Sequence, residues 1–248
     1  IRGRDQRPGR VASQVYPRID VMLAGWTYQL KQKRHLARCQ HGRMREYLRA
    51  AAPSRKADFR KGCYLAVDLE MTGMEVDSDH ILSIGFVPID NMRVMLAGAR
   101  HILVRSPLGV GQSAVIHGIH DRDMVGASSL SEAMDCLLEA LQGRVLLLHY
   151  AALDLAFLRE ASQRLYGVPL LAMVVDTLVL ENQRLQRNSA GQHGQGLRLS
   201  DCRRRYNLPD YHAHNALVDA VATAELFLAQ VAHRFGPEHA PLARIVSG

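Results

Sequence analysis

The stretch Tyr64-Leu-Ala-Val-Asp68-Leu-Glu70 begins with four apolar residues and ends with two acids separated by one leucine. An apolar run of this length, followed by the turn residues Met71 to Gly73, predicts a buried strand that ends in a turn. Side chains two positions apart point to the same face of a strand, so Asp68 and Glu70 share a face. Two buried carboxylates repel one another and lose hydration, which favours a cation between them. The alternative is a pair of solvated acids at a strand end.

Around this stretch, the sequence alternates between short apolar runs and longer amphipathic segments. The further strands are expected at residues 81–89, 99–105, 144–149 and 173–176, and the helices at 129–141, 154–166, 177–185, 199–206 and 215–235. Strands come first in this order, and helices and strands then alternate, which is typical of a mixed sheet with helices packed on it. We therefore expect one α/β domain with a five-stranded mixed sheet flanked by helices over residues 62–248.

Two more acids fall where they can join the first pair. Asp154 follows the strand at 144–149 and opens a helix, which places it at the carboxyl end of a strand, where α/β sheets carry their sites. The alternative role for Asp154 is that of a helix N-cap. Asp219 lies in the first turns of the last helix, where simple solvation is the alternative. His214 stands five residues before Asp219 and can share its site only from the loop before that helix; His212 is a competing candidate.

Charge is distributed unevenly along the 248 residues. Residues 1–61 contain 16 Lys and Arg against four acids, whereas residues 62–248 contain 15 basic and 20 acidic side chains. Residues 1–18 are rich in Arg, Gly and Pro, which favours disorder. Residues 20–52 have apolar side chains at helical spacings up to Pro53, which predicts two helices. We interpret residues 1–61 as a basic, partly helical N-terminal arm and linker that contacts a phosphate-bearing partner or, alternatively, only keeps the chain soluble.

Composition excludes several classes of protein. The chain is 48% hydrophobic and 22% charged, as globular proteins are, and no apolar run reaches the roughly 18 to 20 residues that a membrane span needs. The four cysteines form no C-x-x-C pair that would suggest zinc or a redox dithiol. We expect a cytoplasmic protein, although the chain begins with Ile1 and so a removed targeting segment stays possible.

Three motifs, in order along the chain, resemble those of the DEDDh 3′-to-5′ exonucleases, a family that includes the proofreading epsilon subunit of bacterial DNA polymerase III, ribonuclease T and oligoribonuclease. The motifs are Asp68-Leu-Glu70-Met71-Thr72-Gly73, His149-Tyr150-Ala-Ala-Leu-Asp154 and His214-Asn-Ala-Leu-Val-Asp219. The resemblance covers about residues 64–232, and the segments Ile116-His117-Gly-Ile and Val175-Asp176-Thr also match the family. Tyr150 and Leu153 depart from it, because many members have Asn and Phe there.

The resemblance implies an RNase H-like fold in which Asp68, Glu70, Asp154 and Asp219 hold two Mg²⁺ ions, with Mn²⁺ as a possible substitute. An all-oxygen ligand set of four carboxylates suits two such hard cations. The resemblance makes His214 the general base, and it makes Met71, Thr72, Gly73, His149 and Tyr150 contacts of the substrate. The implied activity is two-metal hydrolysis that releases nucleoside monophosphates from single-stranded 3′ ends.

Three questions stay open at this point. The segment Leu69 to Gly73 resembles oligoribonuclease, whereas 214–227 resembles the proofreading type, so DNA and RNA both remain candidate substrates. A non-catalytic nucleic-acid-binding module is the alternative from another functional class. The basic arm has no counterpart in a minimal proofreading domain, and it could equally meet a polymerase or another protein partner; the sequence gives no oligomeric state.

Overall fold

The computed structural model of this chain describes residues 21–106, 118–119, 121–187, 196–211 and 214–246, without the side chains of residues 21–26, 121 and 122. Several expectations lie outside these residues: disorder in residues 1–18 and the placement of Ile116, His117 and His212.

Helices and strands follow the predicted order closely. The strands are β1 (Cys63–Met71), β2 (Ile81–Asp90), β3 (Arg93–Val94), β4 (Arg100–Leu103), β5 (Val145–Leu148) and β6 (Val174–Asp176). The helices are α1 (Val21–Arg38), α2 (Gly42–Arg49), α4 (Leu130–Leu141), α5 (Ala151–Tyr166), α6 (Thr177–Arg187), α7 (Leu199–Arg205) and α8 (Ala216–Phe235). Short 3₁₀ turns lie at Phe59–Lys61, Leu96–Gly98, Asp121–Met124 and Leu242–Arg244.

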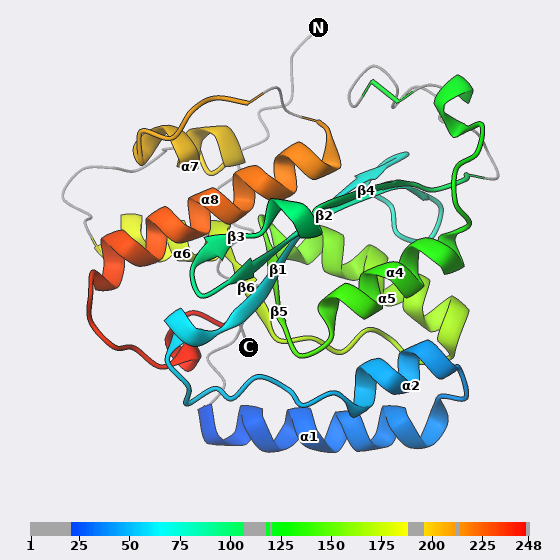
Figure 1. Ribbon diagram of the computed structural model, residues 1–248, viewed down its shortest axis with the longest axis horizontal. Coiled ribbons are helices and arrows are strands. Elements are labelled where there is room, and N and C mark those ends of the chain that lie inside the picture. The colour runs from blue at the N-terminus through cyan, green and yellow to red at the C-terminus, as the bar shows by residue number, and fades with distance from the viewer. Residues whose placement is uncertain (1–20, 107–117, 120, 188–195, 212–213, 247–248) are drawn as a thin grey trace, which may run out of the picture.

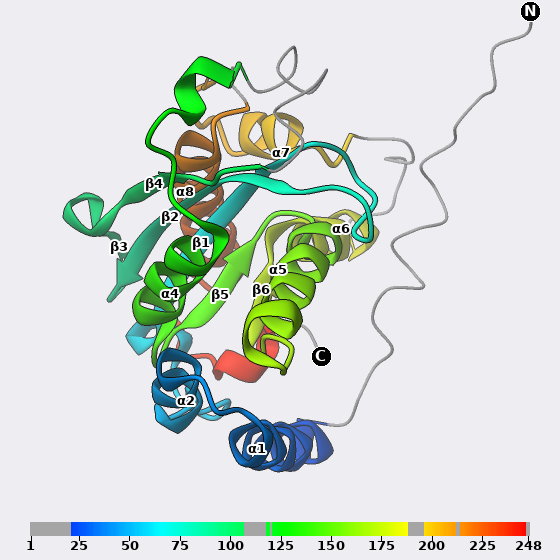
Figure 2. The ribbon, with the colours of Figure 1, turned by 90° about the vertical axis from the view of Figure 1, so that its right-hand side faces the viewer.

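The sheet is mixed, as predicted, and has the order β3-β2-β1-β5-β6, with β4 also paired to β2. β1 pairs antiparallel with β2 and parallel with β5. The sheet has six strands rather than the expected five. The additional strand is β3, which the turn at Asn91 and Met92, both with positive φ, folds back onto the end of β2. Helices cover both faces (Figures 1 and 2). The fold is RNase H-like.

The alternation of β1 assigns each residue to one of the two faces. Leu65, Val67 and Leu69 pack into the core on the side of α4 and α5. Tyr64 and Ala66 pack on the opposite side, in a core that includes Phe227 of α8. Because side chains two apart share a face, Asp68 and Glu70 continue the α8 face beyond the point where its apolar residues end. The predicted shared face of the two acids is therefore the face that α8 covers.

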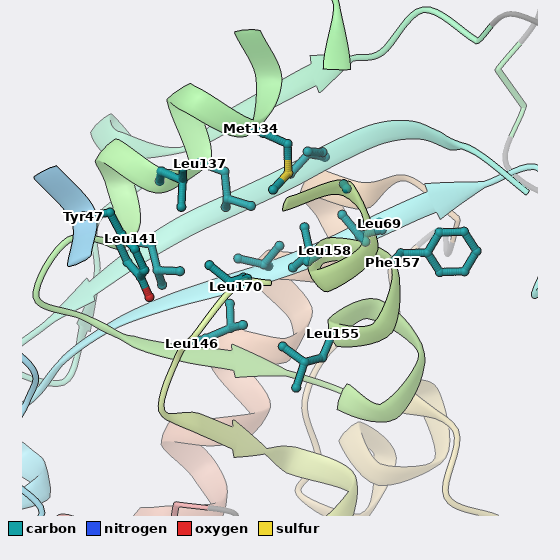
Figure 3. Close-up of a cluster of buried hydrophobic side chains, with 14 of the residues drawn as sticks. Tyr47, Leu69, Met134, Leu137, Leu141, Leu146, Leu155, Phe157, Leu158 and Leu170 are labelled. Carbon is teal, nitrogen blue, oxygen red and sulfur yellow. The ribbon is translucent and has the colours of Figure 1, made fainter. Parts of the chain in front are cut away.

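The larger core lies between the sheet and α2, α4 and α5 (Figure 3). Ser129 begins α4 with a capping box, in which its hydroxyl accepts from the Glu132 amide and the Glu132 carboxylate accepts from the Ser129 amide. Leu137 and Leu141 of α4 and Leu158 of α5 are fully buried in this core. Tyr47 enters it from α2, and its hydroxyl donates to the Leu171 carbonyl at 2.7 Å.

The two predicted N-terminal helices lie against the end of the domain where β1 begins, at the bottom of both ribbon views (Figures 1 and 2). Met44 and Leu48 of α2 are buried in the larger core. Gln32 of α1 donates to the Leu48 carbonyl at 2.7 Å, and Tyr28 of α1 reaches the Leu171 carbonyl at 3.3 Å. Contacts with the domain therefore hold both helices.

Within the described part of the chain, α8 is the one helix long and apolar enough to cross a membrane by length and composition. Half of that window is buried inside the protein. Ala220, Ala224 and Phe227 are fully buried, the latter two in the core on this side of the sheet. A central helix of a folded domain passes the same test, and α8 has that position here.

Candidate functional site

Asp68 and Glu70 lie near the carboxyl end of β1, opposite Gly85 and Ser83 of β2. The register between the two strands shifts after Glu70, which ends the regular pairing there. Glu70 is 8% exposed, so both its backbone and its carboxylate are held in the interior. The strand thus places both acids in the wall of a cleft at the edge of the sheet.

Gly85 is a residue that sequence reasoning missed. A Cβ at this position would overlap the backbone of Ala216 and Leu217 in the first turn of α8. Only glycine lets the start of α8 come so close to β2, at the residue that pairs with Asp68 of β1. An isolated glycine within an apolar strand was the available signal, since it marks a close approach of another backbone.

The close approach of α8 brings Asp219 to the acids of β1. Asn215 begins the helix as predicted, and its side chain accepts from the Val218 amide. Carboxylate oxygens of Asp68, Glu70 and Asp219 all lie within 4.8 Å of one another. Three oxygen donors at this separation can share one cation, so the structure brings together three of the four predicted metal ligands.

Asp154 reaches the same cleft from the first turn of α5. The helix starts at Ala151 rather than at Asp154, because Tyr150 has a left-handed backbone (φ 68°) that turns the chain directly from β5 into the helix. Asp154 is therefore not the N-cap. Asp154 is buried, with 6% of the residue exposed.

Asp176, at the end of β6, holds this turn in place and was not assigned a role from the sequence. Its carboxylate accepts from the Tyr150 and Ala151 amides at 3.1 and 2.9 Å, and from the Leu178 amide at 2.9 Å. One buried carboxylate thus caps the starts of α5 and α6 together. The signal was an acid directly before a predicted helix.

The electrostatics of the cleft are those of a cluster of buried acids. Burial, together with repulsion from the nearby Asp219 and Asp154, raises the pKa of Glu70 to about 7. The pKa of Asp154 is also about 7, chiefly through burial. Burial, followed by repulsion from Asp154, raises the pKa of Asp68 well above its usual value, and burial raises that of Asp219. The all-oxygen donor set, its spacing and its mutual repulsion fit a divalent cation such as Mg²⁺.

His214 lies at the edge of this cleft in the loop before α8, where the sequence required it to be. Its backbone is left-handed (φ 70°), and its amide donates to the Asp219 carboxylate at 2.7 Å. The backbone of this residue therefore orients one acid while its exposed imidazole borders the cleft.

The expected substrate contacts divide into two groups. Met71 and the half-exposed Tyr150 border the cleft, whereas Thr72 and Gly73 do not. The Thr72 hydroxyl instead donates to Asp79 at 2.8 Å within the β1–β2 loop, and a Cβ on Gly73 would overlap the Asp79 carboxylate.

His149 borders the cleft, but internal hydrogen bonds engage both of its ring nitrogens. Nδ1 lies 2.8 Å from the Thr177 hydroxyl, and Nε2 lies 3.0 Å from the Leu197 carbonyl. Burial lowers its pKa to about 4, so the ring is neutral at pH 7. A neutral ring in this position ties the segment before α7 to the edge of the sheet.

The cleft has a volume of about 570 Å³ and is bordered on its far side by α7 and the segment that follows it. Arg198 and Tyr211, which the sequence did not single out, belong to this border, as does Leu153. The buried Arg203 donates to the Pro209 carbonyl at 2.9 Å and to Glu225 at 2.8 Å, which fastens the segment carrying Tyr211 onto α8. Glu225 is thereby engaged outside the acid cluster.

Comparison with known proteins agrees with this fold. The family described as Exonuclease (RNase T) matches residues 65–227. The DNA polymerase III subunit epsilon of Treponema pallidum (strain Nichols) is 28% identical over 170 residues, which cover 68% of this chain and 77% of that protein. The nuclease domain of 3′hExo, a DEDDh family member solved with bound rAMP, superposes with a TM-score of 0.58 at 15% identity, over 75% of this chain and 98% of that one.

A larger relative matches in one segment alone. The PolC-type DNA polymerase III of Caldanaerobacter subterraneus subsp. tengcongensis is 26% identical over 168 residues, which cover 68% of this chain but 11% of that protein. This chain therefore spans about a tenth of the PolC-type relatives it matches. The family match covers most of the chain, including all four acids of the cleft. The chain belongs to the RNase T exonuclease family, whose DEDDh members its three motifs resemble.

Proposed function

We propose that this chain is a divalent-metal-dependent 3′-to-5′ exonuclease that removes nucleoside monophosphates from single-stranded DNA ends. The observation that carries the proposal is the convergence of Asp68, Glu70 and Asp219 within 4.8 Å, with Asp154 in the same cleft. These four residues would hold two Mg²⁺ ions, for which Mn²⁺ can substitute. When bound, such ions lower the pKa of the attacking water and neutralise charge on the departing 3′ oxygen.

The chain's own residues supply the remaining parts of the reaction. The imidazole of His214, through its unprotonated ring nitrogen, accepts a proton from the water that attacks the terminal phosphorus. The bond from phosphorus to the 3′ oxygen breaks, which releases a nucleoside 5′-monophosphate and leaves a new 3′ hydroxyl on the strand. Met71 and Tyr150 border the cleft where the terminal nucleotide would lie, and Thr72 and Gly73 would act by shaping the loop beside it.

The first experiment is degradation of matched 5′-labelled single-stranded DNA and RNA with Mg²⁺, with Mn²⁺ and with a chelator. We expect a metal-dependent ladder that shortens from the 3′ end, with DNA degraded faster, as the similarity to the epsilon subunit suggests. Faster degradation of RNA would instead favour the oligoribonuclease or ribonuclease T type. No cleavage by folded protein would favour a non-catalytic binding module.

A matched pair of histidine variants tests the general base. His214→Gln should reduce the rate by about 10²- to 10⁴-fold, whereas His212→Gln should not. The opposite pattern would transfer the role to His212. Nucleic-acid affinity measured in chelator should change little in either variant, because the proposed role is proton transfer rather than binding.

We also propose that exposed basic side chains of α1 contact nucleic-acid phosphates. Lys31, Lys33, Arg34 and Arg38 are exposed on this helix. Deleting residues 1–61 would remove the buried Met44 and Leu48, so replacing the four basic residues with Gln is the cleaner test. We expect weaker binding of DNA and a shallower salt dependence. Unchanged affinity and salt slope would point to a polymerase or another protein partner.

A further inference from the structure

A second cavity, of about 220 Å³, lies between α6, the end of α7 and the C-terminal half of α8. We refer to it as the α6–α8 pocket; its polar lining consists of Arg184, Arg187, Tyr206, Gln230, His233 and Arg234. Arg234 follows Asp219 by fifteen residues on the same helix, which places it about 22 Å along α8 from the acid cluster. The pocket and the catalytic cleft are therefore separate.

The pocket has an excess of positive charge. The buried carboxylate of Glu181 lies beside it, but Arg184 at 2.6 Å and Arg205 at 2.8 Å already pair with that carboxylate. Within the part of the chain that the structure describes, no carboxylate forms an ion pair with Arg187 or Arg234. At least two guanidinium groups at the pocket thus lack a counter-ion.

Two buried polar atoms at the pocket also lack hydrogen-bond partners among the described residues, namely Arg234 Nε and Gln230 Oε1. The Gln230 amide nitrogen is engaged, since it donates to the Thr177 carbonyl at 2.9 Å. Burial lowers the pKa of Arg234, and the positive charges of Arg187 and Arg244 lower it further. Unpaired buried polar groups are costly, so their presence favours a ligand that supplies both an anion and a hydrogen-bond donor.

We propose that the α6–α8 pocket binds the phosphate group of a nucleotide. Guanidinium groups present paired N–H donors that match phosphate oxygens, and a nucleotide also has the hydroxyl or amino donors that the Gln230 carbonyl requires. The choice of a nucleotide over other phosphate compounds rests on the proposed function, whose product is a nucleoside monophosphate. The phosphate can belong to that free product or to the strand being degraded.

Equilibrium binding to the full chain in chelator tests this proposal, because without divalent ions the acid cluster repels phosphate and no cleavage occurs. The probes are thymidine 5′-monophosphate, inorganic phosphate and a 5′-labelled oligothymidylate. We expect Arg187→Glu to weaken binding about tenfold or more, since it replaces a charged donor with an acid on the exposed end of α6. Arg93→Glu, on the exposed β3, makes the same charge change elsewhere and should leave affinity within about twofold.

A second variant, Arg234→Gln, should weaken binding of the same probe that Arg187→Glu affects. The melting temperature of the Arg234→Gln protein is recorded to show that it folds. Weakened binding of the monophosphate assigns the free nucleotide to the pocket, and weakened binding of the oligonucleotide alone assigns the strand; both results support the site. No saturable binding of any probe, or equal binding by the wild type and both pocket variants, overturns it. The result is separable from the proposed activity, because Asp68→Asn should abolish cleavage and leave binding in the pocket intact.

Discussion

The two ends of β1 lie in opposite environments: buried acids surround its carboxyl end, and a packed apolar core surrounds its amino end. At its carboxyl end, Asp68 and Glu70 are buried among other acids, and the pKa values of these carboxyls are raised. At its amino end, the basic helix α2 inserts Tyr47 and Met44 into a well-packed core. The two regions lie at opposite ends of the domain in Figures 1 and 2. Packing therefore stabilises the domain at one end of β1, whereas repulsion among buried acids destabilises it at the other end, where the proposed metal ligands lie.

Neutralising one acid should give the largest effect. Asp68→Asn should reduce exonuclease activity at least about 10³-fold, because it removes a proposed metal ligand. The same change should raise the melting temperature of the metal-free protein at pH 8, since it relieves repulsion among buried carboxylates. Gel assays and calorimetry measure the two effects.

Asp77→Asn removes the same charge from an exposed position and is the matched control for both measurements. Full activity in folded Asp68→Asn protein would contradict the assignment of the cleft, and a lower melting temperature would contradict the account of its electrostatics.

The second-largest loss of activity is expected from a substitution that separates α8 from β2. Gly85→Ala should push the first turn of α8 away and displace Asp219, with a loss of activity of about 10²-fold. Gly42→Ala meets no atom within 4 Å and is the control. Retention of metal affinity and rate in Gly85→Ala would show that the helix accommodates the methyl group without moving the acid.

A smaller effect is expected from pH, which should change the stability of the metal-free protein through the acids at the carboxyl end of β1. Glu70 and Asp154 have pKa values of about 7 when folded without metal, against about 4 in an unfolded chain. As pH falls towards 7, the folded state takes up protons while the unfolded carboxyls stay ionised, so stability of the metal-free protein should rise as pH falls from 8.5 to 6.5. The window stops there because His149, with a lowered pKa, has the opposite effect below it.

The melting temperature should rise by about 2 to 4 °C over this window in chelator, and the rise should be smaller with saturating Mg²⁺, which keeps the carboxylates ionised. Glu70→Gln should reduce the slope. An identical slope in wild type and Glu70→Gln would mean that the cluster does not govern it.

The smallest effect on activity is expected at the other end of the domain. Met44→Ala should lower the free energy of unfolding by about 2–5 kcal/mol, because it opens a cavity in a fully buried position, yet leave the rate of the folded enzyme unchanged. Met95→Ala, at a position 42% exposed, should cost much less stability. Denaturant unfolding and rates measured well below the midpoint check both, and a rate loss in Met44→Ala would show that the two ends are coupled.

Most of the elements, and their mixed-sheet arrangement, could be predicted because each depends on local patterning. Ser129 and Asn215 begin their helices as their capping chemistry predicts. The start of α5 was misplaced by three residues, since the backbone of Tyr150 is held left-handed by hydrogen bonds from its turn to Asp176 of β6. That partner is 26 positions away, and local patterning does not reveal such a contact.

By itself, the sequence determined that Asp68 and Glu70 share one face of a strand, because side chains alternate along extended backbone whatever surrounds it. Whether Asp219 and Asp154 lie near this pair depends on tertiary packing. The approach of α8, which carries Asp219, depends on the absence of a side chain at Gly85. The position of Asp154 depends on the start of α5, whose Ala151 amide donates to the Asp176 carboxylate. Distances between segments far apart in the chain follow from packing and capping across the whole domain, and no single segment contains them.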